Sequence, residues 1–132
     1  MVDGAKVLVI EDDEKSRHDL ETVLRFLGED PISVASRNWS EPAELAIPNS
    51  SEVVVAIIGS IDSIRLEELL SDIYEWEACI PFVIVGRKEL LDPADLELKS
   101  RITAFLDKDL SYQSLLDALH KSKLFHDHYN RL

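Results

Sequence analysis

The feature that most constrains the fold of this chain is an alternation of short apolar runs with segments of helical period. The runs are rich in β-branched residues and lack polar alternation, which is typical of strands buried on both faces. They lie at residues 7–10, 32–34, 53–58, 82–85 and 102–106. Because parallel strands need long crossover connections, the alternation predicts a five-stranded parallel sheet with helices on both faces.

Three of the intervening segments predict helices clearly. Residues 14–27 carry leucines at helical spacing, and Gly28 follows where a left-handed C-terminal cap is expected. Residues 64–73 place their isoleucines and leucines on one face. The last segment begins at Ser111, a residue type that caps helix N-termini. These helices complete a doubly wound α/β domain of flavodoxin-like type.

Two other parts of the chain give weaker helical signals. Residues 40–48 allow a short helix, and Pro93 leaves one or two helical turns at residues 94–98. We therefore expect a three-layer sandwich whose fourth helix is short or irregular. The domain is expected to occupy residues 1–120, and residues 121–132 are expected to extend the last helix beyond it.

Composition excludes several classes of function. The 132 residues suffice for one domain with its own core, and a net charge of −12 argues against direct nucleic-acid binding. The single cysteine, Cys79, excludes an internal disulfide and a thiolate zinc site. Among the tail histidines, His126 and His128 cannot share one helical face, whereas His120 and Asp127 can, and no further ligand of suitable spacing follows, so a zinc site is disfavoured. No cofactor is expected. We find no signal peptide or membrane span and expect a cytoplasmic protein.

Residues at and near the carboxyl ends of the predicted strands resemble those of the receiver domain of response regulators, and the resemblance covers essentially the whole chain. In VLVIEDDEKSR, Glu11 and Asp12 match the acidic pair with which receivers hold magnesium. In ITAFLDKDLS, Lys108 matches the lysine that contacts the phosphoryl group. Phe105 matches the aromatic position that often changes rotamer on activation. The resemblance implies a CheY-like receiver fold.

The chain departs from the receiver pattern at the positions that make an acyl phosphate. Gly59 fills the position of the phosphoryl-accepting aspartate, Gly86 that of the Ser or Thr after strand four, and Asp109 that of the proline after the lysine. Glycine offers no nucleophile, and a magnesium site that has lost one carboxylate is weakened. We therefore expect no catalytic residue and no enzymatic activity.

The remaining acids then have another expected role. Glu11 and Asp12 form a vestigial acidic pocket, and we expect Lys108 to bridge to them in preference to a bound ion. Ser60 and Asp62 lie just beyond the third strand and are the alternative phosphoryl acceptors.

A narrower resemblance is to the N-terminal domain of the FleQ and FlrA flagellar master regulators. It rests on RFLGED, IIGSIDS, IPFVIVG and LSYQSLLDALHKSK. It implies a parent protein in which an AAA+ ATPase domain acting on RpoN-type polymerase follows, and then a helix-turn-helix domain. DNA, ATP and cyclic di-GMP binding would belong to those domains. Implied partners are a second copy, the AAA+ domain and an anti-activator ATPase, with no nucleic acid or membrane.

The sequence thus favours a phosphorylation-independent regulatory and dimerisation module that acts through domain contacts. The alternatives are a receiver that uses a displaced acid such as Asp62, and a stand-alone adaptor that ends at Leu132. Trp39, Tyr74 and Trp76 are either half-buried packing residues or interface anchors, because aromatic side chains concentrate binding energy at interfaces.

Overall fold

The structure is a computed structural model of the whole chain. It describes residues 6–36, 53–59, 63–76, 79–86, 99–109 and 111–130. The expected helices at 40–48 and 94–98, with Pro93, lie outside these ranges, and so do Trp39, Ser60 and Asp62.

Five parallel strands form the sheet in the order β2-β1-β3-β4-β5. Their bounds are β1 Lys6–Ile10, β2 Asp30–Val34, β3 Val53–Ile58, β4 Phe82–Val85 and β5 Ile102–Leu106. All five predicted strands are confirmed. The edge strand β2 starts two residues before its β-branched run, at Asp30 and Pro31, because an edge strand tolerates a proline that lacks an N–H.

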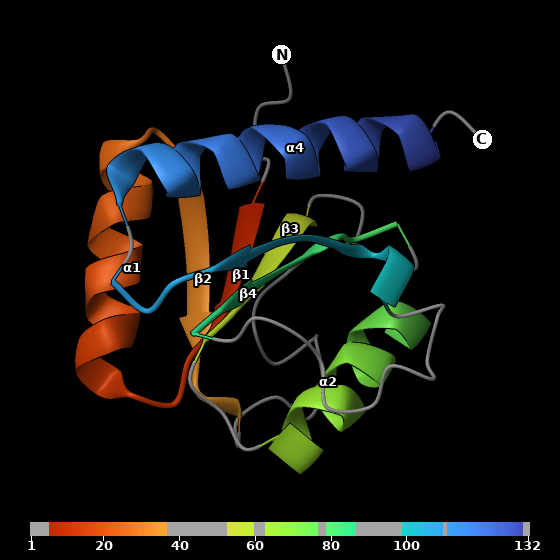
Figure 1. The fold of residues 1–132 in the computed structure, drawn as a ribbon, viewed down its shortest axis with the longest axis horizontal. Coiled ribbons are helices and arrows are strands. Elements are labelled where there is room, and N and C mark those ends of the chain that lie inside the picture. The colour runs from red at the N-terminus through yellow and green to blue at the C-terminus, as the bar shows by residue number, and fades with distance from the viewer. Residues whose placement is uncertain are drawn as a thin grey trace.

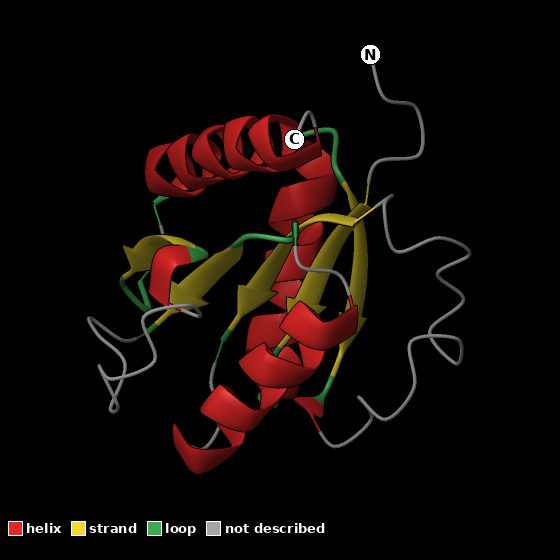
Figure 2. Ribbon diagram, turned by 90° about the vertical axis from the view of Figure 1, so that its right-hand side faces the viewer, coloured by secondary structure: helices red, strands yellow, loops and turns green. Residues whose placement is uncertain are grey.

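Helices cover both faces of the sheet (Figures 1 and 2). Helix α1, Glu14–Phe26, and helix α4, Tyr112–Asn130, pack on one face, and α2, Ser63–Trp76, packs on the other. Alternate residues of β1, and of β3 from Val55 onward, enter the two cores, since successive side chains of a strand point to opposite faces. Val54 and Val55 both lie in the core under α1 and α4, where the pairing of β3 with β1 shifts register. The flavodoxin-like class is confirmed, and so are the helices expected from the first, third and last segments.

Local sequence explains the ends of the helices. Gly28 follows α1 with φ +86°, the left-handed conformation expected of a C-terminal cap. Ser111 precedes α4, and its Oγ accepts a hydrogen bond from the Ser114 N–H at 3.0 Å. Helix α4 still packs on the domain near its end, where Ser122 and His126 are buried. The division of the chain at residue 120 stays a prediction.

Candidate functional site

The carboxyl ends of β1 and β3 lie side by side at the centre of the sheet. Here the strand order reverses, which is where ligands bind in open α/β sheets. The Gly59 N–H donates to the Ile10 carbonyl oxygen at 2.9 Å, and the Glu11 N–H donates to the Val34 carbonyl oxygen at 3.0 Å. Glu11 and Gly59, which the sequence singled out separately, are therefore neighbours.

The side chain of Glu11 occupies the space beside Gly59. A Cβ atom placed on Gly59 would lie 2.8 Å from Cδ of Glu11 and closer still to its Oε1. Glu11 is buried, with 2% of its surface exposed, and its Oε2 accepts a hydrogen bond from the Asp13 N–H at 3.0 Å. A side chain at position 59 and the observed Glu11 conformation thus exclude each other.

Asp12 holds the end of β2 in place. Its Oδ1 accepts from the Ser36 N–H at 2.6 Å, and its Oδ2 accepts from the Ser36 hydroxyl at 2.8 Å. Ser36 is buried, and the Asp12 carboxylate provides acceptors for both its N–H and its hydroxyl. Both acids of the pair are thus engaged in contacts within the chain.

Asp13 caps the N-terminus of α1. Its Oδ2 accepts from the N–H and the hydroxyl of Ser16, at 2.9 and 2.7 Å. These hydrogen bonds lower the pKa of the Asp13 carboxyl, and the charges of Lys108 and Lys15 lower the pKa further. Arg17 donates from Nη1 to the Glu11 carbonyl oxygen at 2.9 Å, which ties α1 to the same turn.

Gly86, the glycine expected at the position of the receiver Ser or Thr, differs from Gly59 in its backbone and in the space around it. Its φ is +84°, a left-handed conformation, whereas a Cβ atom there would meet nothing within 4 Å. The backbone of Gly59 would suit other residues, but Glu11 leaves no space for a side chain there. Gly86 has open space for a side chain, but its left-handed φ disfavours residues other than glycine. A larger residue is therefore disfavoured at Gly59 by its neighbour and at Gly86 by the backbone conformation.

The prediction of a salt bridge between Lys108 and the acidic pair, Glu11 and Asp12, is wrong. No ion pair joins Lys108 to Glu11 or Asp12 among the residues that the structure describes, because the two carboxylates turn to Asp13 and Ser36 instead. Lys108 is exposed, and its charge contributes to lowering the pKa of Asp13. Phe105, which the sequence predicts as the switch aromatic, is half-buried against the α2-side core.

A pocket of about 400 Å³ opens between α1 and the start of α4. Its polar rim includes Glu11, Asp19 and Lys108, while Leu20, Val23, Val85 and Leu115 supply apolar walls. Sequence reasoning missed this pocket, since it depends on how α4 is placed against α1. Within the described parts of the chain, no group of three or more His, Cys, Asp or Glu residues is arranged to hold a metal ion.

The structure bears on the role of two of the three aromatic residues that the sequence assigned either to packing or to an interface. Tyr74 and Trp76 are half-buried against the α2-side core, and the Arg101 guanidinium lies 5.3 Å from the Tyr74 ring centroid. This confirms the packing interpretation for these two residues. None of the described helices is long and apolar enough to cross a bilayer.

The sheet order and the two helical layers define a receiver-like α/β domain. Solved structures agree on the fold. A receiver domain protein from Clostridium thermocellum is 21% identical, with a TM-score of 0.72 over 91% of this chain and 94% of that one. A sensor protein from Polaromonas is 17% identical, with a TM-score of 0.72 over 92% of this chain and 97% of that one.

NtrX from Brucella abortus, solved in complex with ATP, is 15% identical, with a TM-score of 0.70. The match covers 97% of this chain and 29% of the NtrX chain. Residues 6–124 match the family model described as Flagellar regulatory protein FleQ. The chain belongs to this FleQ family.

Proposed function

We propose that this domain regulates a flagellar transcription activator without being phosphorylated, through contacts between protein domains. The observation that carries the proposal is the Glu11 side chain, which lies in the space that a phosphoryl-accepting aspartate at position 59 would need. Phosphotransfer needs a carboxylate in line with phosphorus and a metal ion that neutralises the phosphoryl oxygens. Glycine supplies no carboxylate at this position.

The acidic pair supports the same proposal. A magnesium ion takes carboxylate oxygens that are free to coordinate, and it demands near-octahedral geometry. Asp12 is hydrogen-bonded twice to Ser36, and Glu11 is buried and hydrogen-bonded to the Asp13 N–H. Releasing either carboxylate for a metal would break contacts that fix the ends of β1 and β2. We therefore assign Glu11 and Asp12 a structural role, in which their hydrogen bonds hold the segments after β1 and β2 in place, and no catalytic role.

The regulatory contacts proposed are self-association and contact with an ATPase domain in the same protein. Membership of the FleQ family supports a flagellar regulator, and the match to part of the NtrX chain supports a domain that belongs to a longer protein. The parent protein is proposed to act in the cytoplasm on RpoN-type polymerase. DNA, ATP and cyclic di-GMP binding, and contact with an anti-activator ATPase, are proposed for that parent.

Incubation with acetyl phosphate and magnesium, followed by intact mass measurement, tests the proposal. We expect no phosphoryl adduct, under conditions in which a receiver with the accepting aspartate is modified. An adduct would refute phosphorylation independence. The variant Asp62→Asn would then show whether the displaced acid accepts the group, because the adduct would disappear in that variant.

A further inference from the structure

We propose that the face formed by the end of α1 and the start of α4 is the self-association surface, and that a second copy of this chain covers it. The inference rests on the proposed dimerisation and names the surface that would carry it. It is drawn from three features of this face: exposed apolar side chains, a pocket beside them and a local balance of charge.

The exposed apolar side chains are Phe26, Tyr112 and Leu116, which we call the aromatic ridge. Phe26 is 77% exposed, Tyr112 48% and Leu116 41%. The Phe26 and Tyr112 rings meet edge to face, with centroids 5.7 Å apart and planes at 73°. Tyr112 and Leu116 are four residues apart and share one side of α4. Exposed apolar side chains that adjoin one another in this way make the ridge a candidate interaction surface.

The pocket adjoins the ridge, because Tyr112 belongs to both. A protruding Phe26 and an apolar hollow of about 400 Å³ thus lie on the same face. A two-fold dimer requires a self-complementary surface, in which the protrusion of each copy meets the hollow of the other. The ridge and the pocket together supply both halves of such a contact.

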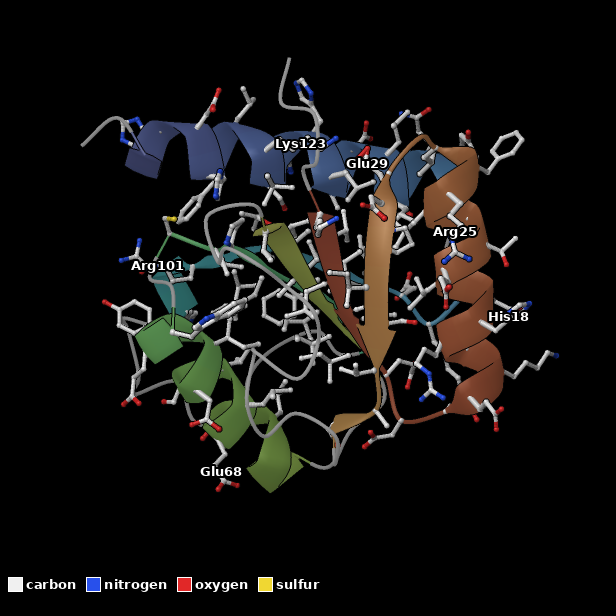
Figure 3. All side chains as sticks on the ribbon, turned by 180° about the vertical axis from the view of Figure 1, so that it is seen from behind. His18, Arg25, Glu29, Glu68, Arg101 and Lys123 are labelled. Atoms are coloured by element: carbon white, nitrogen blue, oxygen red, sulfur yellow. The ribbon has the colours of Figure 1, made fainter. Side chains whose placement is uncertain are left out.

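Charge favours a second copy on this face over the α2 face. The chain carries a net charge of −12, so two copies repel unless the contact is locally balanced. Helix α1 has three acidic and three basic residues other than histidine, and α4 has two of each. Helix α2 has four acidic residues and one arginine. Figure 3 shows Arg25 on α1 and Glu68 on α2 at opposite sides of the molecule.

The α1–α4 junction is also held firmly. Lys123 of α4 pairs with Glu29, just after α1, at 2.7 Å, and Figure 3 shows these side chains together. Leu20, Leu24, Leu115 and Leu119 are buried in one core beneath the two helices. A face whose two helices share a core can present the ridge without rearrangement on binding.

Sedimentation velocity of the 132-residue chain over a concentration series tests the surface. We compare the wild type with Phe26→Ser and Leu116→Ser, and use Leu124→Ser as the matched control, since Leu124 is 58% exposed on the same helix outside the ridge. Each ridge variant is expected to raise the dimer Kd at least about tenfold, and the control variant by less than about twofold. Ridge variants that dimerise like the wild type would overturn the surface and leave dimerisation itself standing.

A monomeric wild type at millimolar concentration would overturn both the surface and the dimerisation part of the proposed function. Phosphorylation independence is tested by a separate assay, and this result would not affect it.

An amide NMR dilution series on the wild type tests the same surface without a variant. We expect shifts at the end of α1 and the start of α4, whereas shifts confined to α2 would contradict the inference.

Discussion

The contact between Glu11 and position 59 makes a sharp prediction about the variant Gly59→Ala. The three heavy atoms nearest to the added Cβ would all belong to Glu11: Oε1, Cδ at 2.8 Å and Cβ at 3.4 Å. Accepting the methyl group requires the carboxylate to leave its place and its hydrogen bond from the Asp13 N–H. Overpacking of this kind costs roughly 1–3 kcal/mol, and we expect about 2 kcal/mol of lost unfolding free energy.

The variant Glu11→Ala provides the partner for a double-mutant cycle. It removes Oε1 and Cδ but keeps its own Cβ, which at 3.4 Å is an ordinary van der Waals neighbour. In this background Gly59→Ala is expected to be near neutral, or to stabilise by about 0.5 kcal/mol because alanine restricts the unfolded chain. The coupling between the two substitutions is therefore expected to be about 2 kcal/mol.

Urea denaturation of the wild type, the two single variants and the double variant measures this coupling. The matched control is Gly86→Ala, which has open space around its Cβ and a φ of +84°. Its cost of roughly 1–2 kcal/mol comes from the backbone, so Glu11→Ala should not relieve it. If Gly59→Ala costs the same in both backgrounds to within about 0.5 kcal/mol, Glu11 does not fill the site.

Three further predictions concern the neighbouring charges. Asp12→Ala should cost roughly 1–3 kcal/mol in urea denaturation, because the buried Ser36 N–H loses its acceptor, whereas Ser36→Ala should cost less because the backbone bond persists. The pKa of Asp13 is lower in the folded protein than in the unfolded chain, where it is about 3.9. The ionised Asp13 therefore stabilises the fold fully above that pH, and this contribution is lost as pH falls through the pKa of Asp13 in the folded protein. Asp13→Asn should therefore flatten the acid limb of stability against pH, and an unchanged limb would contradict the capping role. Lys108→Gln should change the free energy of unfolding by less than about 0.5 kcal/mol, since the exposed ammonium makes no ion pair with Glu11 or Asp12 among the described residues. A loss above about 1 kcal/mol would indicate that Lys108 does pair with one of these acids.

The sequence predicted the positions at the strand edge but not how their side chains interact. Strand ends are fixed by β-branched runs, so Glu11, Gly59 and Gly86 could be placed at one edge from residue types alone. The turn of Glu11 toward Gly59 depends on the rotamer that the neighbouring backbone allows. The left-handed φ of Gly86 was likewise invisible, because glycine permits it without requiring it.

The last helix shows the same limit in another form. The sequence shows several leucines along this helix but does not tell which of them are buried. In the structure Leu115 and Leu119 are buried, while Leu116 and Leu124 are exposed. A broad apolar distribution does not determine which part faces the sheet, since that depends on how the helix crosses it. In Figure 1, α4 lies across the end of α1, and the exposed ridge results from that arrangement.

Titration with beryllofluoride and magnesium, followed by amide NMR, tests the central claim most directly, because beryllofluoride forms a phosphoryl-like adduct with the accepting aspartate of a receiver. The amides to follow are those of Glu11, Asp13 and Gly59, which surround the filled position. We expect no saturable shift of these three signals. Saturable shifts confined to them would show that the edge still takes up a phosphoryl-like group, and would contradict the proposal that Gly59, with the Glu11 side chain in the space beside it, leaves no acceptor there.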